Sequence, residues 1–240
     1  MNYKEILDFS MDYSKKESLT RVAIGYPLKY IAIFFTKYLL KSKLTPNELT
    51  IGMILSGIMG AFLFCMPSIW IKIIGIIFIW LWFVLDICDG IVARIKKQFS
   101  KFGKELDYCA HVINHPLFNL SFMITVLQIT KDYRFSILFF LIVVLNLAYR
   151  FFNCINIIYI NKMKEVNLDI KNIKDVAKFK RLIIFCINFF IHFPNYALIF
   201  PIICLINLRV ALIYSLLVIL INLIYIPYIY IKFIFKIKDL

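Results

Sequence analysis

Long apolar runs separated by short charged segments limit the fold of this chain more than any other feature. The run from Ile71 to Leu85 contains a single charged residue, Lys72, and comparable runs recur along the chain. Hydrophobic residues make up 62% of the 240 residues, and the mean hydropathy is +0.83. A helix of about 20 apolar residues crosses the hydrocarbon core of a membrane. The sequence therefore predicts an all-α integral membrane protein with about six transmembrane helices.

The apolar runs also predict where these helices lie. The six predicted spans cover residues 49–66, 69–96, 104–130, 135–160, 181–206 and 210–233. Pro116 falls inside the third span and predicts a kink there. Residues 161–180 are polar and predict a cytosolic connection between the fourth and fifth spans.

The residues before the first span have a different character. Residues 1–20 predict a surface helix, and residues 27–43 predict an interfacial amphipathic helix, because Lys29 and Lys37 interrupt its apolar residues. We therefore expect two parts: an interfacial segment, residues 1–48, and a six-helix membrane domain, residues 49–240.

Lys and Arg residues are distributed unevenly among the predicted connections. Most precede the first span or lie between the second and third and between the fourth and fifth, whereas the opposite side holds only Lys72, Lys131, Arg134 and Arg209. Cytoplasmic loops carry the excess of basic residues. We therefore expect both termini to face the cytoplasm, as in a protein of a bacterial-type inner membrane. The net charge of +14 then indicates attraction to anionic lipid rather than to nucleic acid.

Acidic residues lie at the ends of the second and third predicted spans. Asp86 and Asp89 share one helix face, and Asp107 and His111 share a face of the next helix. Ionisable groups within membrane segments are costly and indicate a functional site. Such a carboxylate cluster requires cations, and oxygen ligands favour Mg²⁺ or Mn²⁺, which in turn bind phosphates. The alternative is that these carboxylates are solvated charges at helix ends.

The same stretch resembles the signature of the CDP-alcohol phosphatidyltransferases, Asp-x-x-Asp-Gly-x-x-Ala-Arg-x8-Gly-x-x-x-Asp-x-x-x-Asp. The chain departs from it at the last position, where His111 stands in place of the fourth Asp. Upstream, the segment Thr45-Pro46-Asn47-Glu48-Leu49-Thr50 is similar to the family's Pro-Asn-x-x-Thr segment before its first membrane helix. From its residues alone, this segment predicts a helix start with Asn47 as the N-cap. The signature positions that match are Asp86, Asp89, Gly90, Ala93, Arg94, Gly103 and Asp107.

The resemblance implies a reaction and a set of roles. The family transfers a substituted phosphate group from a CDP-alcohol or CDP-diacylglycerol to an acceptor hydroxyl, releases CMP, and often works as a homodimer in the membrane. Asp86, Asp89 and Asp107 would bind the Mg²⁺ or Mn²⁺ ions. The residues expected beside the nucleotide are Asn47, Thr50, Asp89, Gly90, Ala93, Arg94 and Gly103. Arg94 also fits a second interpretation, as a positive-inside anchor.

His111 occupies the position of the family's proposed general base. A neutral imidazole accepts a proton near pH 7, so we expect an active enzyme with His111 as the base. The alternative is an impaired homologue that binds a CDP-linked ligand without turnover. A transporter is a weaker alternative, because the carboxylates lie at the cytoplasmic ends of the helices and no pair of broken helices repeats across two halves.

Three further polar residues stand inside predicted spans. Arg150 shares a helix face with Asn146 and Asn153. An anionic acceptor is a natural partner for a buried arginine, and arginines of related enzymes bind such acceptors. The alternative is that Arg150 pairs with backbone carbonyls or with an Asp of the cluster. His115 precedes Pro116, and we expect a structural role. His192, beside Pro194, predicts a helix kink with satisfied polar groups.

Overall fold

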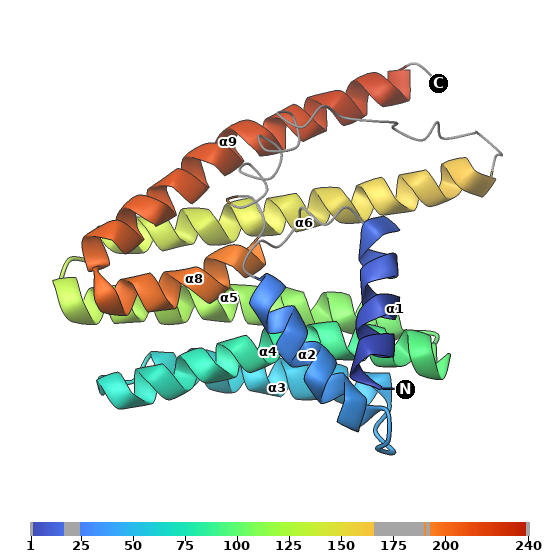
Figure 1. Ribbon diagram of the computed structural model, residues 1–240. Helices are drawn as coiled ribbons and strands as arrows, with labels where there is room; N and C mark the ends of the chain where they lie inside the picture. Colours follow the sequence, from blue (N-terminus) through green and yellow to red (C-terminus); the bar gives the residue numbers. More distant parts are fainter. Residues whose placement is uncertain (1, 17–24, 166–189, 191–192, 239–240) are drawn as a thin grey trace.

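The computed structural model describes residues 2–16, 25–165, 190 and 193–238, and every regular element in these ranges is an α-helix (Figure 1). This confirms the predicted all-α class. Three predicted features fall at least in part outside the described residues. His192 lies outside them, as do most of the predicted connection at residues 161–180 and the start of the fifth span. The helices are α1 (Tyr3–Lys16), α2 (Gly25–Leu39), α3 (Pro46–Phe64), α4 (Ile69–Lys96), α5 (Gly103–Thr130), α6 (Phe135–Glu165), α8 (Phe193–Ile206) and α9 (Leu208–Lys238).

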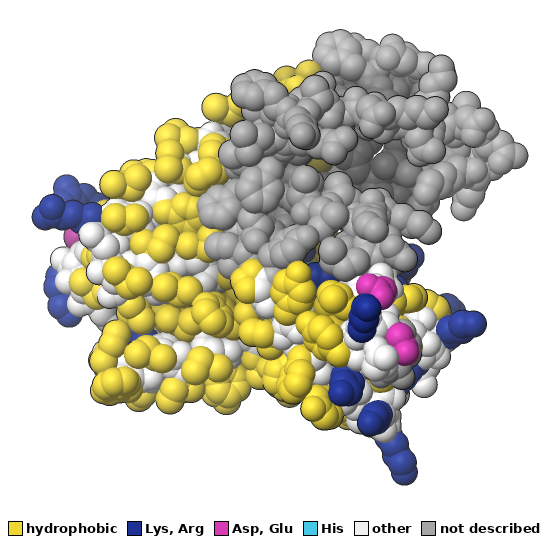
Figure 2. Space-filling model, viewed as in Figure 1, with side chains coloured by type: hydrophobic (Ala, Val, Ile, Leu, Met, Phe, Trp, Pro, Cys, Tyr) yellow, Lys and Arg dark blue, Asp and Glu magenta, His cyan; other side chains and the backbone are white. Residues whose placement is uncertain are grey.

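Five helices in the described ranges, α3, α4, α5, α6 and α9, are long and apolar enough to cross a membrane. They agree with five of the six predicted spans, and the bounds of α4 match the prediction at both ends. The described part of the remaining span is α8, an apolar helix of 14 residues. Figure 2 shows the same property on the surface: hydrophobic side chains cover the middle of the molecule, and Lys and Arg side chains gather at its two ends. The structure is that of an all-α membrane protein.

The start of α3 corrects one prediction. Thr45, and not Asn47, is the N-cap residue. The backbone N–H of Glu48 donates to Thr45 Oγ1 (3.3 Å), and the backbone N–H of Thr45 donates to Glu48 Oε2 (2.7 Å). This reciprocal capping box satisfies backbone donors that a helix start otherwise leaves unpaired. It leaves the side chain of Asn47, in the first turn, available for other contacts.

Helices α3, α4 and α5 form a tight group because small residues allow close backbone approach. A Cβ atom at Gly75 of α4 would lie 2.7 Å from the backbone nitrogen of Phe64 in α3, and a Cβ atom at Gly60 would lie 2.9 Å from that of Ile79. Small residues have this role in membrane bundles. Helix α2 packs on this group through its contact with α4. Helices α6 and α9 pack against each other, and α8 contacts α4, α5 and α9 (Figure 1).

The predicted amphipathic helix corresponds to α2. Leu28 and Ala32 are buried, whereas Ile31 and Phe35 are exposed. The exposed surface of α2 is rich in large apolar side chains: Tyr30, Ile31, Phe34, Phe35 and Tyr38. Such a surface suits a helix that lies at a membrane interface.

At the end of the bundle where α3 meets α4, Lys72 is buried, with only 5% of its surface exposed. Its Nζ donates to the backbone oxygen of Phe64 (2.9 Å), to Thr125 Oγ1 (3.0 Å) and to Gln128 Oε1 (3.2 Å). A cation at the carboxyl end of a helix is favourable because the last carbonyl groups carry partial negative charge. Lys72 therefore joins the end of α3 to α5.

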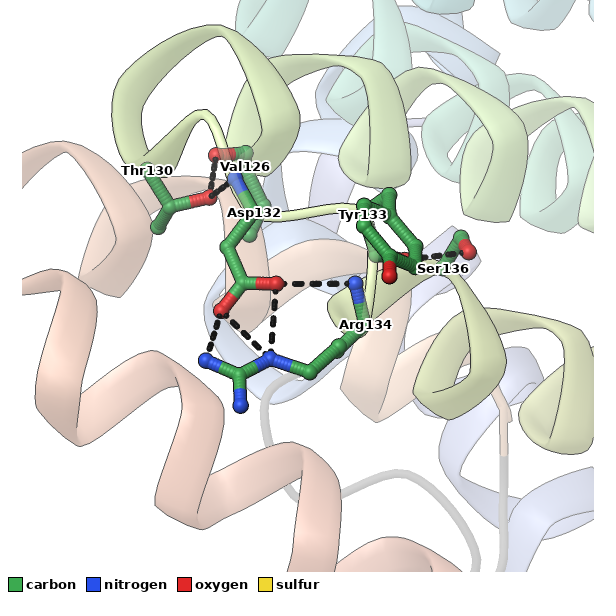
Figure 3. Close-up of polar contacts among 6 residues, drawn as sticks. All are labelled: Val126, Thr130, Asp132, Tyr133, Arg134 and Ser136. Atoms are coloured by element: carbon green, nitrogen blue, oxygen red, sulfur yellow. Dashed lines mark hydrogen bonds and ion pairs between the residues drawn. The ribbon is translucent and has the colours of Figure 1, made fainter.

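The connection between α5 and α6 lies at this same end and is held by local polar contacts (Figure 3). Arg134 donates to both carboxylate oxygens of Asp132, with the shortest contact at 2.7 Å. These hydrogen bonds hold the pKa of Asp132 below its usual value, and Asp132 in turn raises the pKa of Arg134. Lys131 ends α5 in the left-handed conformation, with φ of 58°. The tight turn sends the chain back antiparallel to α5.

Candidate active site

The acidic residues predicted from the motif meet where α4 and α5 pack. His111 Nε2 lies 3.3 Å from Asp86 Oδ1 and 3.5 Å from Asp107 Oδ1. One ligand atom from each of these three residues falls within 4.8 Å of the other two. The spacing of the motif therefore places Asp107 and His111 on the face of α5 that meets Asp86 of α4. We call Asp86, Asp107 and His111 the acidic triad.

The acidic triad fits a divalent cation. Oδ1 of Asp107 is buried and has no hydrogen-bond partner among the described residues, and carboxylates held this close together require a positive charge. Two carboxylates and an imidazole suit Mn²⁺ and similar ions, while Mg²⁺ is commonly bound by one or two carboxylates together with phosphate oxygens. The donor set thus agrees with a metal site and leaves the identity of the ion open.

Asp89, the third predicted metal ligand, is placed differently. It is buried, with 8% of its surface exposed, and its Oδ2 accepts a hydrogen bond of 2.7 Å from Thr50 Oγ1. Asp89 does not belong to the group of three that lies within ligand distance. The structure therefore separates the predicted set into Asp86 and Asp107, which face His111, and Asp89, which faces Thr50 in α3.

A cleft of about 630 Å³ opens beside these carboxylates, between the start of α3, the end of α4 and the start of α5. This volume is in the usual range for small-molecule sites. Asp107 also lines the cleft, so the cleft and the acidic triad adjoin. Its lining includes all seven residues expected beside the nucleotide: Asn47, Thr50, Asp89, Gly90, Ala93, Arg94 and Gly103.

Side chains of the cleft lie against two of its glycines. A Cβ atom at Gly90 would lie 3.3 Å from Nη1 of Arg94, so the guanidinium lies against the bare backbone at Gly90. A Cβ atom at Gly103 would lie 2.8 Å from Ser100 Oγ. Ser100 Oγ in turn donates to Asn47 Oδ1 (3.0 Å), which joins the α4–α5 connection to the first turn of α3.

Sequence reasoning missed several polar residues of the cleft. Lys101 and Lys104 line it, together with Gln98 and Ser100. The two lysines entered the prediction only as evidence for membrane orientation. Their position between the two halves of the acidic motif was the available signal, because a connection that joins two walls of a site also borders it. Both lysines are exposed, and they add positive charge to a cleft that Asp89 and Asp107 also line.

Among the described residues, the side chain of Arg150 in α6 makes its hydrogen-bond contacts with His115, which the sequence had not paired with it. Its Nη2 lies 2.9 Å from Nδ1 and 3.0 Å from Nε2 of His115, on α5. Asn146, predicted on the same face of α6, has its Oδ1 3.3 Å from His115 Nδ1. The charge of Arg150 also interacts with those of Asp107 and Asp86. The side chain of Asn153 lies outside the described part.

Comparison with known proteins agrees with this geometry. The family profile described as CDP-alcohol phosphatidyltransferase matches residues 43–221, from the capping segment of α3 into α9. A search of curated proteins finds no matching relative. The match covers more than half of the 240 residues and includes the whole motif from Asp86 to His111. The chain belongs to the CDP-alcohol phosphatidyltransferase family.

Proposed function

We propose that the protein transfers a substituted phosphate group from a CDP-alcohol or CDP-diacylglycerol to an acceptor hydroxyl, with release of CMP. The reaction takes place at the cytoplasmic membrane face, in the synthesis of phospholipids or related glycolipids. One observation carries this proposal: the cleft lined by all seven expected nucleotide residues adjoins the acidic triad.

Family membership gives the coarse function directly. CDP-alcohol phosphatidyltransferases transfer a phosphatidyl group from a CDP-alcohol in lipid synthesis, and the several long apolar helices make this a multi-pass membrane protein. The proposal adds the side of the membrane, the roles of individual residues, a homodimeric state and the fate of the nucleotide.

The cleft suits the nucleotide part of the donor. In the proposal the cytidine lies against Gly90 and Ala93, where short side chains leave room, and Asn47, Thr50 and Arg94 contact the nucleotide. Lys101 and Lys104 line the cleft, and in the proposal their charges attract a diphosphate. Gly103 lets the α4–α5 connection pass close to Asn47, because its missing Cβ leaves space for Ser100.

The carboxylates hold a divalent cation, Mg²⁺ or Mn²⁺, in this proposal. Asp86 and Asp107 are the ligands that face one another across the two helices, and Asp89 completes the set from the cleft side. A bound cation neutralises the diphosphate and stabilises the negative charge that develops during transfer. The hydrogen bond from Thr50 fixes the orientation of the Asp89 carboxylate.

His111 is the proposed proton acceptor. The acceptor oxygen forms a new bond to the phosphorus that carries the transferred group, and the bond from that phosphorus to the bridging diphosphate oxygen breaks. CMP leaves with the bridging oxygen, and the hydroxyl proton passes to the imidazole of His111. Nearby Asp86 and Asp107 favour the imidazolium that results, because opposite charges at 3.3 and 3.5 Å attract.

Arg150 is the proposed binding residue for an anionic group on the acceptor. It comes from α6, which packs on α5, whereas the nucleotide cleft is lined by α3, α4, α5 and the α4–α5 connection; in the proposal, donor and acceptor therefore reach the acidic triad from different helices. Its charge interacts with Asp107 and Asp86, which agrees with a position next to the reacting atoms.

A second candidate function rests on His111 itself. The family signature has a carboxylate at this position, and its loss removes one negative charge from the cation site. On that alternative the protein binds a CDP-linked ligand without turning it over. The difference between the two candidates is catalytic, so a binding measurement alone does not separate them.

The experiment is an assay of CMP release by the purified protein in detergent, with Mg²⁺ or Mn²⁺, across a panel of CDP-alcohols and hydroxyl acceptors. Turnover by the wild type that is lost in Asp107→Ala supports the enzyme and identifies the donor. Silence of the wild type together with activity of His111→Asp supports the impaired homologue. Silence of both, across the panel, overturns the proposal.

A further inference from the structure

Two phenylalanine side chains stand exposed in the polar connection between α4 and α5. Phe99 has 73% of its surface exposed and Phe102 has 66%. Lys101 Nζ lies 5.6 Å from the centroid of the Phe102 ring, whereas no ring or cation among the described residues covers the ring of Phe99. Phe99 lines the nucleotide cleft, and Phe102 does not. Among the described residues that line the cleft, only Phe99 is aromatic.

The residues on either side of Phe99 are held by hydrogen bonds. The backbone N–H of Gln98 donates to the carbonyl of Ala93 (3.0 Å), which satisfies one of the last carbonyl groups of α4. On the other side, Ser100 Oγ donates to Asn47 Oδ1 (3.0 Å) in the first turn of α3. Phe99 therefore lies between two anchored neighbours. Because its backbone is already fixed, the ring loses little conformational entropy when a ligand contacts it.

The cleft extends along α4 from the carboxylates to Phe99. Asp89 lies about two helical turns before the end of α4 at Lys96, and Phe99 follows in the connection. In the proposed function the diphosphate lies at the carboxylates, so the base of the same nucleotide points along the cleft toward the end of α4. The side chain of Phe99 borders the cleft at that end.

A stacked base suits this end of the cleft. A nucleobase presents two flat faces, and aromatic side chains stack on such faces in proteins that bind unpaired bases. Gly90 and Ala93 leave room for the ring of the base, and Phe99 offers a ring to contact it. Stacking also removes from water an apolar side chain that is otherwise exposed, which is favourable.

We propose that Phe99 is the stacking platform for the cytosine ring of the donor, so that the α4–α5 connection contributes directly to nucleotide affinity. The inference rests on the proposed function for the identity of the ligand, and it deepens that proposal by naming a binding residue outside the family signature. Phe99 occupies one of the unspecified positions between Arg94 and Gly103. Since stacking tolerates different bases, Phe99 adds affinity without distinguishing cytosine from uracil.

The test separates the base from the rest of the nucleotide. Isothermal titration of the purified full-length protein in detergent compares CMP with ribose 5-phosphate, which keeps the sugar and the phosphate but lacks the base. We expect Phe99→Ala to bind CMP about tenfold more weakly than the wild type, and UMP more weakly by the same factor. Binding of ribose 5-phosphate should stay within about twofold of the wild type, because that ligand has no ring to stack.

The matched control is Phe102→Ala. It removes a second exposed ring from the same connection, but one that does not line the cleft, so binding of CMP should stay within about twofold of the wild type. Equal weakening in Phe99→Ala and Phe102→Ala would indicate a general effect of altering the connection and would overturn the inference. Unchanged CMP binding in Phe99→Ala, or an equal loss for CMP and ribose 5-phosphate, would also overturn it.

Two further variants separate stacking from apolar contact of any kind. Phe99→Trp keeps a ring and should bind CMP within about threefold of the wild type, whereas Phe99→Leu keeps an apolar side chain without a ring and should weaken CMP binding nearly as much as Phe99→Ala does. Because the side chain is exposed, thermal unfolding should be the same in all these variants. Equal CMP binding by the Trp and Leu variants would show that the ring is not what binds the base.

The binding result is independent of turnover. If CMP binds in the expected Phe99-dependent way but the protein releases no CMP from any donor, the proposed catalysis fails and the stacking site stands. If CMP is released from a donor but Phe99→Ala binds CMP as the wild type does, the proposed function stands and this inference fails.

Discussion

Thr50 and Asp89, 39 residues apart in the sequence, are joined by a hydrogen bond of 2.7 Å from the threonine hydroxyl to the carboxylate. The bond connects α3 to α4 at the inner wall of the nucleotide cleft, and both side chains are buried. It turns one carboxylate of the motif toward the cleft, while Asp86 and Asp107 face His111. The arrangement of these five residues leads to several predictions.

Replacing Thr50 by Val removes this hydrogen bond with little change in side-chain volume. We expect CDP binding to weaken about tenfold, because Asp89 loses the partner that orients it. Isothermal titration of CDP into the purified protein measures the change. Thr125→Val is the matched control: Thr125 Oγ1 donates to the Phe64 carbonyl at the far end of the bundle (2.8 Å), so its loss should lower stability and leave CDP binding unchanged. Equal weakening in both variants would contradict a local role for Thr50.

Replacing His111 by Asp adds a fourth carboxylate to the site. Since the number of charged ligands tunes the affinity for divalent cations, we expect Mn²⁺ to bind about tenfold more tightly or better. Electron paramagnetic resonance of free Mn²⁺ in the presence of the protein gives the affinity directly. Asp107→Asn should shift the affinity in the opposite direction. Unchanged Mn²⁺ binding in both variants would place the cation elsewhere.

Replacing Gly75 by Ala tests the close approach of α3 and α4. The added Cβ would lie 2.7 Å from the Phe64 backbone nitrogen, which cannot move without displacing α3. We expect a loss of about 1–3 kcal/mol in stability, measured by thermal unfolding in detergent. Gly52→Ala serves as the comparison, because the nearest atom to its added Cβ is the end of the Leu85 side chain at 3.8 Å. That change should be neutral or slightly stabilising. A similar loss in both would mean that helix flexibility, and not close packing, explains the glycines.

The ion pair of Asp132 and Arg134 predicts a pH dependence. Because the folded-state pKa of Asp132 lies below its usual value of 3.8, the pair stabilises the folded protein above that pH and loses this effect as pH falls through the lowered pKa. Asp132→Asn should therefore be less thermally stable than the wild type at about pH 7, with a difference that shrinks as the pH falls through the lowered pKa of Asp132. Since the pair is exposed, the difference should be small and should decrease in high salt. A difference that is constant with pH would show that the charge of Asp132 is not involved.

Much of this architecture follows from local sequence patterns. The bounds of α4 and the meeting of Asp86, Asp107 and His111 come from apolar length and helical spacing, which are properties of neighbouring residues. The capping box was also visible, because Glu48 follows Thr45 by three residues, but the prediction gave the cap to Asn47.

The rest depends on pairings between distant helices. No local pattern joins Arg150 to His115, which are 35 residues apart, or Lys72 to the end of α3 and to Gln128. The separation of Asp89 from the other carboxylates depends on Thr50 of another helix. A family signature identifies such residues together and does not distinguish which of them face one another.

The most direct test of the central claim is whether CMP release requires an acceptor hydroxyl. With purified protein, a CDP-linked donor and Mn²⁺ or Mg²⁺, we predict that CMP appears only when the acceptor is added, and that one molecule of phosphodiester product forms for each CMP. Release of CMP at the same rate without any acceptor would show hydrolysis in place of transfer, and the absence of CMP with every donor and acceptor tested would contradict the enzyme itself.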